Sequence, residues 1–147
     1  MYTADICKLP VNDIAADNSI LFMWATFSKL PDALEVIKAW GFQYKTVGFV
    51  WVKENKKSPG LFMGMGMWTR SNAEICLVAV KGRPQRIDYG VHQVIISPIE
   101  YHSKKPDEVR ERIIQLMGDL PRLELFARQV PPGWAVWGNE VDSTVLL

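Results

Sequence analysis

Residues 21–26 read LFMWAT, and this short, almost continuous apolar run is one of four that decide the fold. The other three read VGFVWV at 47–52, ICLVAV at 75–80 and LELF at 123–126. Runs of this length with so few polar positions are typical of strands buried on both faces. We therefore predict four strands in the interior of a sheet.

Two helices are predicted between the strands. In the first, over residues 31–40, Leu34, Ile37 and Trp40 recur at helical spacing before Gly41 ends the segment. The second has a stronger start signal, since it offers a cap, an early proline and two acids, followed by an apolar face and a glycine stop. These residues are Ser103, Pro106, Asp107 and Glu108, then Val109, Ile113, Leu116 and Met117, then Gly118.

A strand over residues 122–128 follows the second helix, and another over 134–139 follows a Pro-Pro-Gly turn. Alternating strands and helices predict an α/β fold with a mostly parallel sheet. Ligands of such sheets bind beyond the carboxyl ends of the strands. Residues 53–70 (KENKKSPGLFMGMGMWTR) differ from the rest and predict a long, mobile loop, a kind of segment that is often functional.

Composition limits the class of protein more than its substrate. The chain has 147 residues, 48% hydrophobic, with a net charge of +1, so we expect one domain over residues 1–147. No apolar run approaches the ~20 residues of a membrane span, and no leader pattern is visible at the N-terminus. Cys7 and Cys76 are too far apart in sequence to indicate a disulfide scaffold or a metal site, so a reducing cytoplasm is expected.

Six strings, in order and at similar spacing, resemble one family: the MT-A seventy-kilodalton-subunit family of S-adenosylmethionine-dependent adenine-N6 methyltransferases of nucleic acid. They are LFMWAT (21–26), VWVKEN (50–55), WTRSNAEICLVAVKGRP (68–84), HSKKPDEV (102–109), LELFAR (123–128) and GWAVWGNE (133–140). The resemblance implies a Rossmann-like methyltransferase sheet with permuted motif order, in which the catalytic motif precedes the cofactor-binding strand. It implies no metal.

The resemblance also assigns a cofactor site to four residues. Lys105 is similar to the family's lysine that meets the methionine carboxylate, and a helix start suits an anion. Arg128, after LELFA, looks like the arginine that contacts the ribose, and Asn139 with Glu140 matches the polar pair that holds ribose and adenine. Glu140 departs from relatives with glutamine there, although both side chains accept from a hydroxyl. The alternative is that these are ordinary solvated charges at helix and strand ends.

The same resemblance places four residues around the target base or in support of that pocket: Trp51, Lys53, Trp68 and Glu74. Arg70, in the loop before Glu74, is a fifth candidate for substrate binding through its charge. Aromatic faces can stack on a base, and lysine or arginine can meet phosphates. Trp51 lies in an apolar strand, so a core position is an equal alternative for it. Scattered surface charge explains the loop residues Lys53 and Arg70 as well as phosphate contact does.

The family's catalytic motif, Asp-Pro-Pro-Trp, does not occur in these 147 residues. The resemblance places it upstream of the stretch similar to residues 1–11, so we expect an N-terminally truncated chain that lacks a catalytic residue. Pro131-Pro132-Gly133-Trp134 is interpreted as a turn, because Val130 precedes it instead of an acid or amide. The missing strand would be central in the family's sheet, and its loss predicts exposed edges and self-association.

We therefore expect an adenine-N6 methyltransferase domain acting on DNA in a bacterial or phage setting, with RNA as the other substrate class and little activity in this chain alone. The alternative is a non-catalytic nucleic-acid-binding module or a subunit that supports a paralogous partner. A third interpretation is an α/β core without a ligand site. The sequence does not separate these three.

Overall fold

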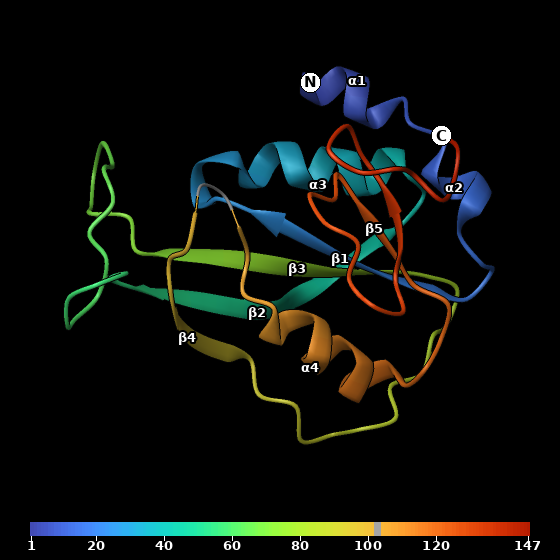
Figure 1. The fold of residues 1–147 in the computed structure, drawn as a ribbon. Helices are drawn as coiled ribbons and strands as arrows, with labels where there is room; N and C mark the ends of the chain where they lie inside the picture. The colour runs from blue at the N-terminus through green and yellow to red at the C-terminus, as the bar shows by residue number, and fades with distance from the viewer. Residues whose placement is uncertain (102–103) are drawn as a thin grey trace.

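The fold is taken from a computed structural model, which describes residues 1–101 and 104–147. Four strands form the main sheet in the spatial order β1, β3, β2, β4 (Figure 1). Their bounds are Ser19–Ala25 for β1, Gln43–Glu54 for β2, Ala73–Lys81 for β3 and Val94–Pro98 for β4. The predicted runs at 21–26, 47–52 and 75–80 fall on β1, β2 and β3, whereas β4 was not predicted.

The prediction of a mostly parallel sheet is wrong for this sheet. β3 pairs antiparallel with both β1 and β2, and only β2 and β4 pair in parallel. A parallel pair needs a long crossover, usually a helix, but β2 and β3 are joined by residues 55–72, which contain no helix. β3 therefore returns beside β2, while β1, β2 and β4 all point the same way. The fold class, α/β, is confirmed.

Helices cover the two faces of this sheet. α3 (Leu30–Ala39) places Val36 and Ile37 in one core cluster, together with Trp40, which follows the helix, and Leu77 of β3. α4 (Glu108–Met117) packs on the other face in a second cluster that contains Cys76. Because neighbouring residues of a strand point to opposite faces, β3 contributes side chains to both clusters. The short elements α1 (Thr3–Cys7), α2 (Val11–Ile14) and the 3₁₀ turn η1 (Phe27–Lys29) complete the α3 side.

The predicted second helix is present but begins later than expected. α4 starts at Glu108 and its N-cap residue is Asp107, which makes no capping hydrogen bond with its side chain. The proposed cap, Ser103, lies outside the described residues. Gly118 ends the helix with φ +86°, a conformation that glycine adopts without strain. The predicted stop is therefore confirmed.

Two further strands form a separate small sheet. β5 (Leu123–Leu125) and β6 (Ala135–Trp137) pair in parallel, so both end at the same edge. Leu125 packs against the cluster beneath α3, which joins the small sheet to the main core. Within the described part of the chain, no helix has the length and apolar character needed to cross a bilayer.

Candidate cofactor and nucleic-acid site

A buried carboxylate held between two lysines marks the carboxyl edge of the main sheet. Glu74, the second residue of β3, is only 7% exposed. Its Oε1 lies 2.8 Å from the Nζ of Lys53, near the end of β2. Its Oε2 accepts a hydrogen bond from the Nζ of Lys105, which lies just before α4. The structure thus brings together three of the predicted site residues, from segments far apart in the sequence.

The two lysines determine the charge state of Glu74. Burial acts to raise the pKa of this carboxyl, but hydrogen bonds from Lys105 and Lys53 outweigh burial and leave the pKa below the usual value. Glu74 is therefore ionised at neutral pH, and the cluster of two ammonium groups and one carboxylate carries a net positive charge. A lysine ammonium has three donors, so the bond to Glu74 leaves Lys105 able to meet another anion.

Two tryptophans support this cluster. Trp51 is 3% exposed, and its indole Nε1 donates to the backbone oxygen of Ser97 at 2.9 Å. Trp24 meets it edge to face, with ring centroids 6.3 Å apart. The Nζ of Lys53 lies 5.2 Å from the Trp51 ring and that of Lys105 lies 5.5 Å from the Trp24 ring. Both lysines therefore gain cation–π attraction as well as the ion pair.

Trp51 accordingly has the core position that the sequence left open. Its indole nitrogen is bonded to Ser97, and its ring packs against the ammonium group of Lys53. A contact between Trp51 and the target base stays a prediction. Trp24 was not singled out in the sequence, although it lies within the LFMWAT string. Its signal would have been an aromatic near the end of a strand, at the edge where ligands of α/β sheets bind.

A second group of predicted residues follows the small sheet. Arg128 comes shortly after β5, and its Nε lies 3.8 Å from the Oε2 of Glu140, which follows β6. Asn139 directly precedes Glu140 and is exposed. Arg128 and Glu140 are thus brought together at the carboxyl edge of the parallel pair, while Lys105 contacts Glu74 and Trp24 on the main sheet.

The backbone at this second edge is unusually constrained. Phe126 has φ +57°, and it is the one non-glycine residue with positive φ in the described chain. The residue is 45% exposed, and its ring meets Trp137 edge to face with the ring centroids 5.2 Å apart. A Cβ on Gly138 would lie 2.8 Å from the carbonyl oxygen of Ala127, so only glycine fits there. Backbone strain of this kind is often found at ligand sites, and sequence reasoning missed Phe126 because propensity does not reveal it.

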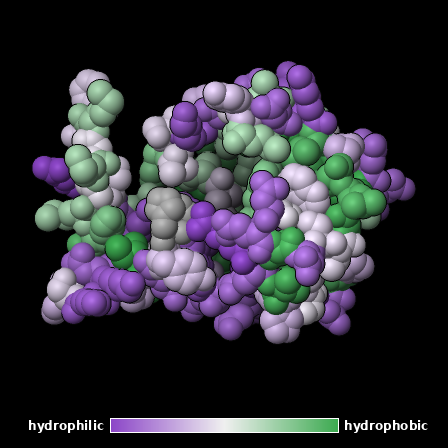
Figure 2. Space-filling view, turned by 45° about the horizontal axis from the view of Figure 1, so that its top comes forward, coloured by the Kyte–Doolittle hydropathy of each residue, from purple (hydrophilic) through white to green (hydrophobic). Residues whose placement is uncertain are grey.

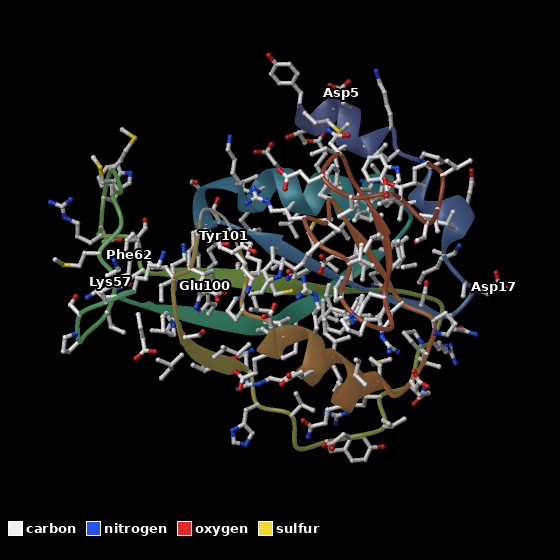
Figure 3. All side chains as sticks on the ribbon, in the orientation of Figure 1. Asp5, Asp17, Lys57, Phe62, Glu100 and Tyr101 are labelled. Carbon is white, nitrogen blue, oxygen red and sulfur yellow. The ribbon has the colours of Figure 1, made fainter. Side chains whose placement is uncertain are left out.

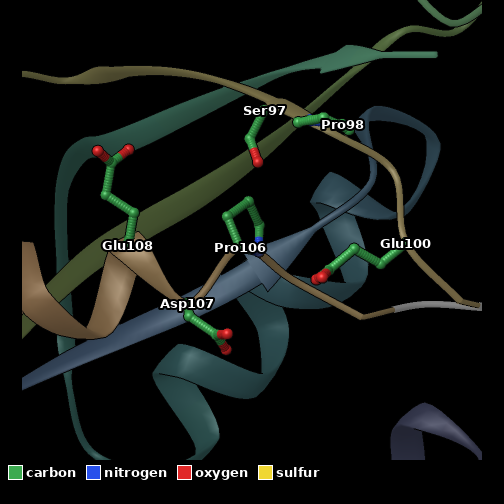
Figure 4. A pocket seen from close by; sticks show the side chains of 6 residues that line it. All are labelled: Ser97, Pro98, Glu100, Pro106, Asp107 and Glu108. Carbon is green, nitrogen blue, oxygen red and sulfur yellow. The ribbon is translucent and has the colours of Figure 1, made fainter. Parts of the chain in front are cut away.

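Two cavities lie beside α4. The first, about 260 Å³, is between the end of β4 and the start of α4 (Figure 4). Its lining residues are Ser97, Pro98, Glu100, Pro106, Asp107 and Glu108. The second, about 430 Å³, lies between α4 and residues 129–134. Neither is lined by Lys105, Arg128 or Asn139, and the three acids of the first make it unsuitable for a carboxylate or phosphate.

Trp68 and Arg70 are not part of the cluster around Glu74. Both belong to residues 55–72, which project from the ends of β2 and β3 (Figure 1), and Trp68 is 97% exposed. Their predicted contact with the substrate therefore depends on a ligand that reaches this projection.

Comparison with known proteins identifies the family of the chain. The MT-A70 family matches residues 1–140. The chain is 36% identical over 141 residues to the type II methyltransferase M.MunI of a Mycoplasma species, covering 95% of this chain and 58% of that protein. It is 33% identical over 138 residues to the human N(6)-adenosine-methyltransferase catalytic subunit METTL3, covering 91% of this chain and 24% of that protein.

The similarity extends to an insect relative, the Drosophila melanogaster N(6)-adenosine-methyltransferase MT-A70-like protein, at 30% identity over 135 residues, or 89% of this chain and 22% of that one. The chain thus spans between about one fifth and three fifths of the length of these relatives. The match over nearly the whole chain shows that it belongs to the MT-A70 family of adenine-N6 methyltransferases.

Proposed function

We propose that this chain is the part of an adenine-N6 methyltransferase of DNA that binds S-adenosylmethionine and borders the target base. The observation that carries the proposal is the position of Lys105. Its ammonium lies at the carboxyl edge of β1, β2 and β4, and its side chain is 30% exposed although Glu74 holds it. A partly exposed, positioned cation at this edge is suited to the carboxylate of a methionine moiety.

The residues at the edge of the small sheet fit the nucleoside half of the cofactor. Glu140 and Asn139 offer oxygens that can accept from the two ribose hydroxyls, and Arg128 offers donors. The exposed ring of Phe126 gives a flat apolar surface for an adenine. Gly138, which follows β6 and lies beside Ala127, adds no side chain between the ends of β5 and β6. S-adenosylmethionine would supply a methyl group on a sulfonium, while the residues named here bind and orient it.

The cluster around Glu74 supports a neighbouring site for the base. Lys53 and Lys105 share one buried carboxylate, so a change at either lysine alters the hydrogen bonding of the other. Glu74 would thereby act as a positioning residue between the two halves of the site. M.MunI and METTL3 are named as methyltransferases, and the resemblance to them supports adenine in nucleic acid as the substrate. DNA is the proposed class, and RNA is the alternative.

Transfer of the methyl group needs acceptors for the hydrogens of the adenine amine, and Asp-Pro-Pro-Trp, which provides them in the family, is absent from these 147 residues. We therefore propose that the chain alone has negligible activity. The second candidate function is a non-catalytic subunit that binds nucleic acid or supports an active paralogue. A non-catalytic subunit would share cofactor binding with the first candidate only if it keeps the site formed by Lys105, Arg128 and Asn139.

Calorimetric titration with S-adenosylmethionine tests the proposal. We expect saturable binding that Lys105→Ala and Asn139→Ala each weaken at least about tenfold, as loss of a charge-assisted or buried hydrogen bond does. Lys104→Ala is the matched control, because the neighbouring lysine pairs with Glu100 and Asp107 instead. Binding that is absent, or equal in all variants, would refute the cofactor site.

A separate assay tests the catalytic part. Labelled methyl transfer to adenine-containing DNA should stay at background for this chain, even with saturating cofactor. Robust turnover would contradict the proposed impairment while leaving the binding proposal intact. Cofactor binding without turnover, together with restored activity when an active family member is added, would favour the partner-subunit alternative.

A further inference from the structure

Residues 55–72, here called the finger, form a projection between β2 and β3. Figures 1 and 2 show it standing away from the body of the molecule at the left. Its base is fixed by backbone hydrogen bonds from Phe62 to Lys53 at 2.9 Å and from Asn55 to Gly60 at 3.0 Å. The side chains of Lys57 and Phe62 mark this base in Figure 3. The finger is thus anchored to the same strand end that carries Lys53 of the candidate site.

Two glycines make the tip of the finger thin. A Cβ on Gly64 would lie 2.4 Å from the carbonyl oxygen of Ser71, and one on Gly66 would lie 2.2 Å from that of Thr69. The two chain segments are therefore pressed together, with a backbone hydrogen bond from Gly64 to Ser71 at 2.8 Å. Only a residue without a side chain permits this approach at these two positions. The tip is therefore a narrow loop in which two chain segments lie in contact through their backbones.

The large side chains of the tip are apolar and almost fully exposed. Met65 is 91% exposed, Met67 98% and Trp68 97%, and Met63 is 73% exposed. By contrast, Trp40 and Trp51 are almost completely buried in the core, so exposure on this scale is not general for the tryptophans of the chain. Large apolar side chains gathered on a projection are characteristic of an interaction surface.

Charge identifies the class of partner. Over residues 55–72 the sequence has Lys56, Lys57 and Arg70 and no aspartate or glutamate, although the whole chain is nearly balanced at +1. All three basic residues are exposed. A partner must therefore be anionic and must also offer flat or apolar surfaces, and DNA combines these as phosphates, base faces and thymine methyl groups.

We propose that the finger enters a groove of duplex DNA beside the target adenine, with Met67 and Trp68 against the bases and Lys56, Lys57 and Arg70 against phosphates. The major groove is wide enough for an α-helix or a two-stranded β-ribbon, so a tip made of two closely apposed chain segments is thin enough to enter it. The inference rests on the proposed function, because the finger grows from the strand that carries Lys53. It adds to that function a device that contacts the duplex outside the cofactor site.

Fluorescence anisotropy with a labelled adenine-containing duplex tests the finger at several salt concentrations. Trp68→Ala should weaken binding about 5- to 150-fold, the range of one lost stacking contact, with an unchanged salt slope. The triple variant Lys56→Gln, Lys57→Gln, Arg70→Gln should lower the slope of log affinity against log salt by about 0.9 for each lost phosphate contact. The two changes thus separate base contact from phosphate contact.

The controls are Tyr2→Ala, an exposed aromatic elsewhere, and the double variant Lys8→Ala, Lys38→Ala, which removes two exposed lysines outside the finger. Both should bind DNA as the unaltered chain does. All finger variants should keep their affinity for S-adenosylmethionine. If the unaltered chain itself does not bind S-adenosylmethionine, that result refutes the proposed function and not the role of the finger.

Three outcomes would overturn the inference. The first is a finger variant that binds duplex with the affinity and salt slope of the unaltered chain. The second is an unaltered chain that binds cofactor but not DNA even at low salt. The third is a set of tip variants that abolish self-association or binding to anionic vesicles while leaving DNA binding unchanged, which would assign the finger to a protein or lipid partner.

Discussion

Replacing Glu74 by glutamine tests the cluster that organises the candidate site. Glutamine keeps the size of the side chain but removes the charge that two lysines share, and it replaces one of the two accepting oxygens by an amide nitrogen that only donates. Lys53 and Lys105 would then face each other without a counter-ion, at 18% and 30% side-chain exposure. Loss of one partner from a fully buried pair costs about 3–5 kcal/mol. Because both lysines can turn toward water, we expect a smaller loss, about 1–3 kcal/mol in the free energy of unfolding.

Urea denaturation at pH 7 gives this free energy, and for a chain of this length the melting temperature should fall about 2–4 °C for each kcal/mol lost. Glu108→Gln is the matched control. The side chain of Glu108 is 50% exposed, and its Oε2 lies 3.2 Å from a guanidinium nitrogen of Arg112. Its replacement should cost no more than about 1 kcal/mol, the range of exposed ion pairs. A double-mutant cycle with Lys53→Met measures the coupling directly.

The pH dependence of the same variant has a definite sign. The pKa of Glu74 is lower in the folded chain than its ordinary value of 4.5, so ionised Glu74 stabilises the fold at every pH above that value. The stabilisation is lost as the pH falls through the folded pKa. The difference between the unaltered chain and Glu74→Gln should therefore be constant from pH 7 to about 5 and shrink below 4.5. A difference below about 0.5 kcal/mol at pH 7, or one that grows in acid, would refute this account of the cluster.

Three other predictions concern the rest of the chain. Burial raises the pKa of Cys76 to about 12, so at pH 8 a thiol reagent should modify it at least about 100-fold more slowly than the half-buried Cys7, and both should react alike in denaturant. Trp51→Phe removes the hydrogen bond to Ser97 and should cost about 1–2 kcal/mol by denaturant titration, whereas exposed Trp68→Phe should change stability by less than about 0.5 kcal/mol. Among the described residues β1 pairs only with β3 and has one unpaired edge, so light scattering should detect self-association that grows with concentration, and a monomer at every concentration would contradict this.

The strands were predictable where apolar runs were continuous, as in β1, β2 and β3, because burial on both faces leaves a local pattern. β4 was not, since Val94 and Ile96 are 47% and 63% exposed and the strand is short. The direction of β3 was mispredicted because a run of apolar residues carries no direction. Only the missing helix in residues 55–72 indicated an antiparallel return.

The candidate site was predictable only residue by residue. The motifs singled out Lys53, Glu74 and Lys105. Lys105 and Glu74, however, are 31 residues apart in the sequence, and no local pattern indicates that they are in contact. Phe126 was missed because its residue type does not reveal its left-handed backbone, which lies where Gly138 closely approaches Ala127. The residue types in the motifs therefore indicated the chemical groups of the site, whereas the packing of the chain determines which of these groups are in contact.

The most direct test of the cofactor site is an amide NMR titration of the assigned chain with S-adenosylmethionine. The proposal predicts that the largest chemical-shift changes gather at two places, around Lys105 and Glu74 and around Phe126, Arg128 and Asn139, and that all follow one binding curve. Shifts confined to one of these places, shifts with different binding constants, or no saturable change would contradict a single pocket for the methyl donor.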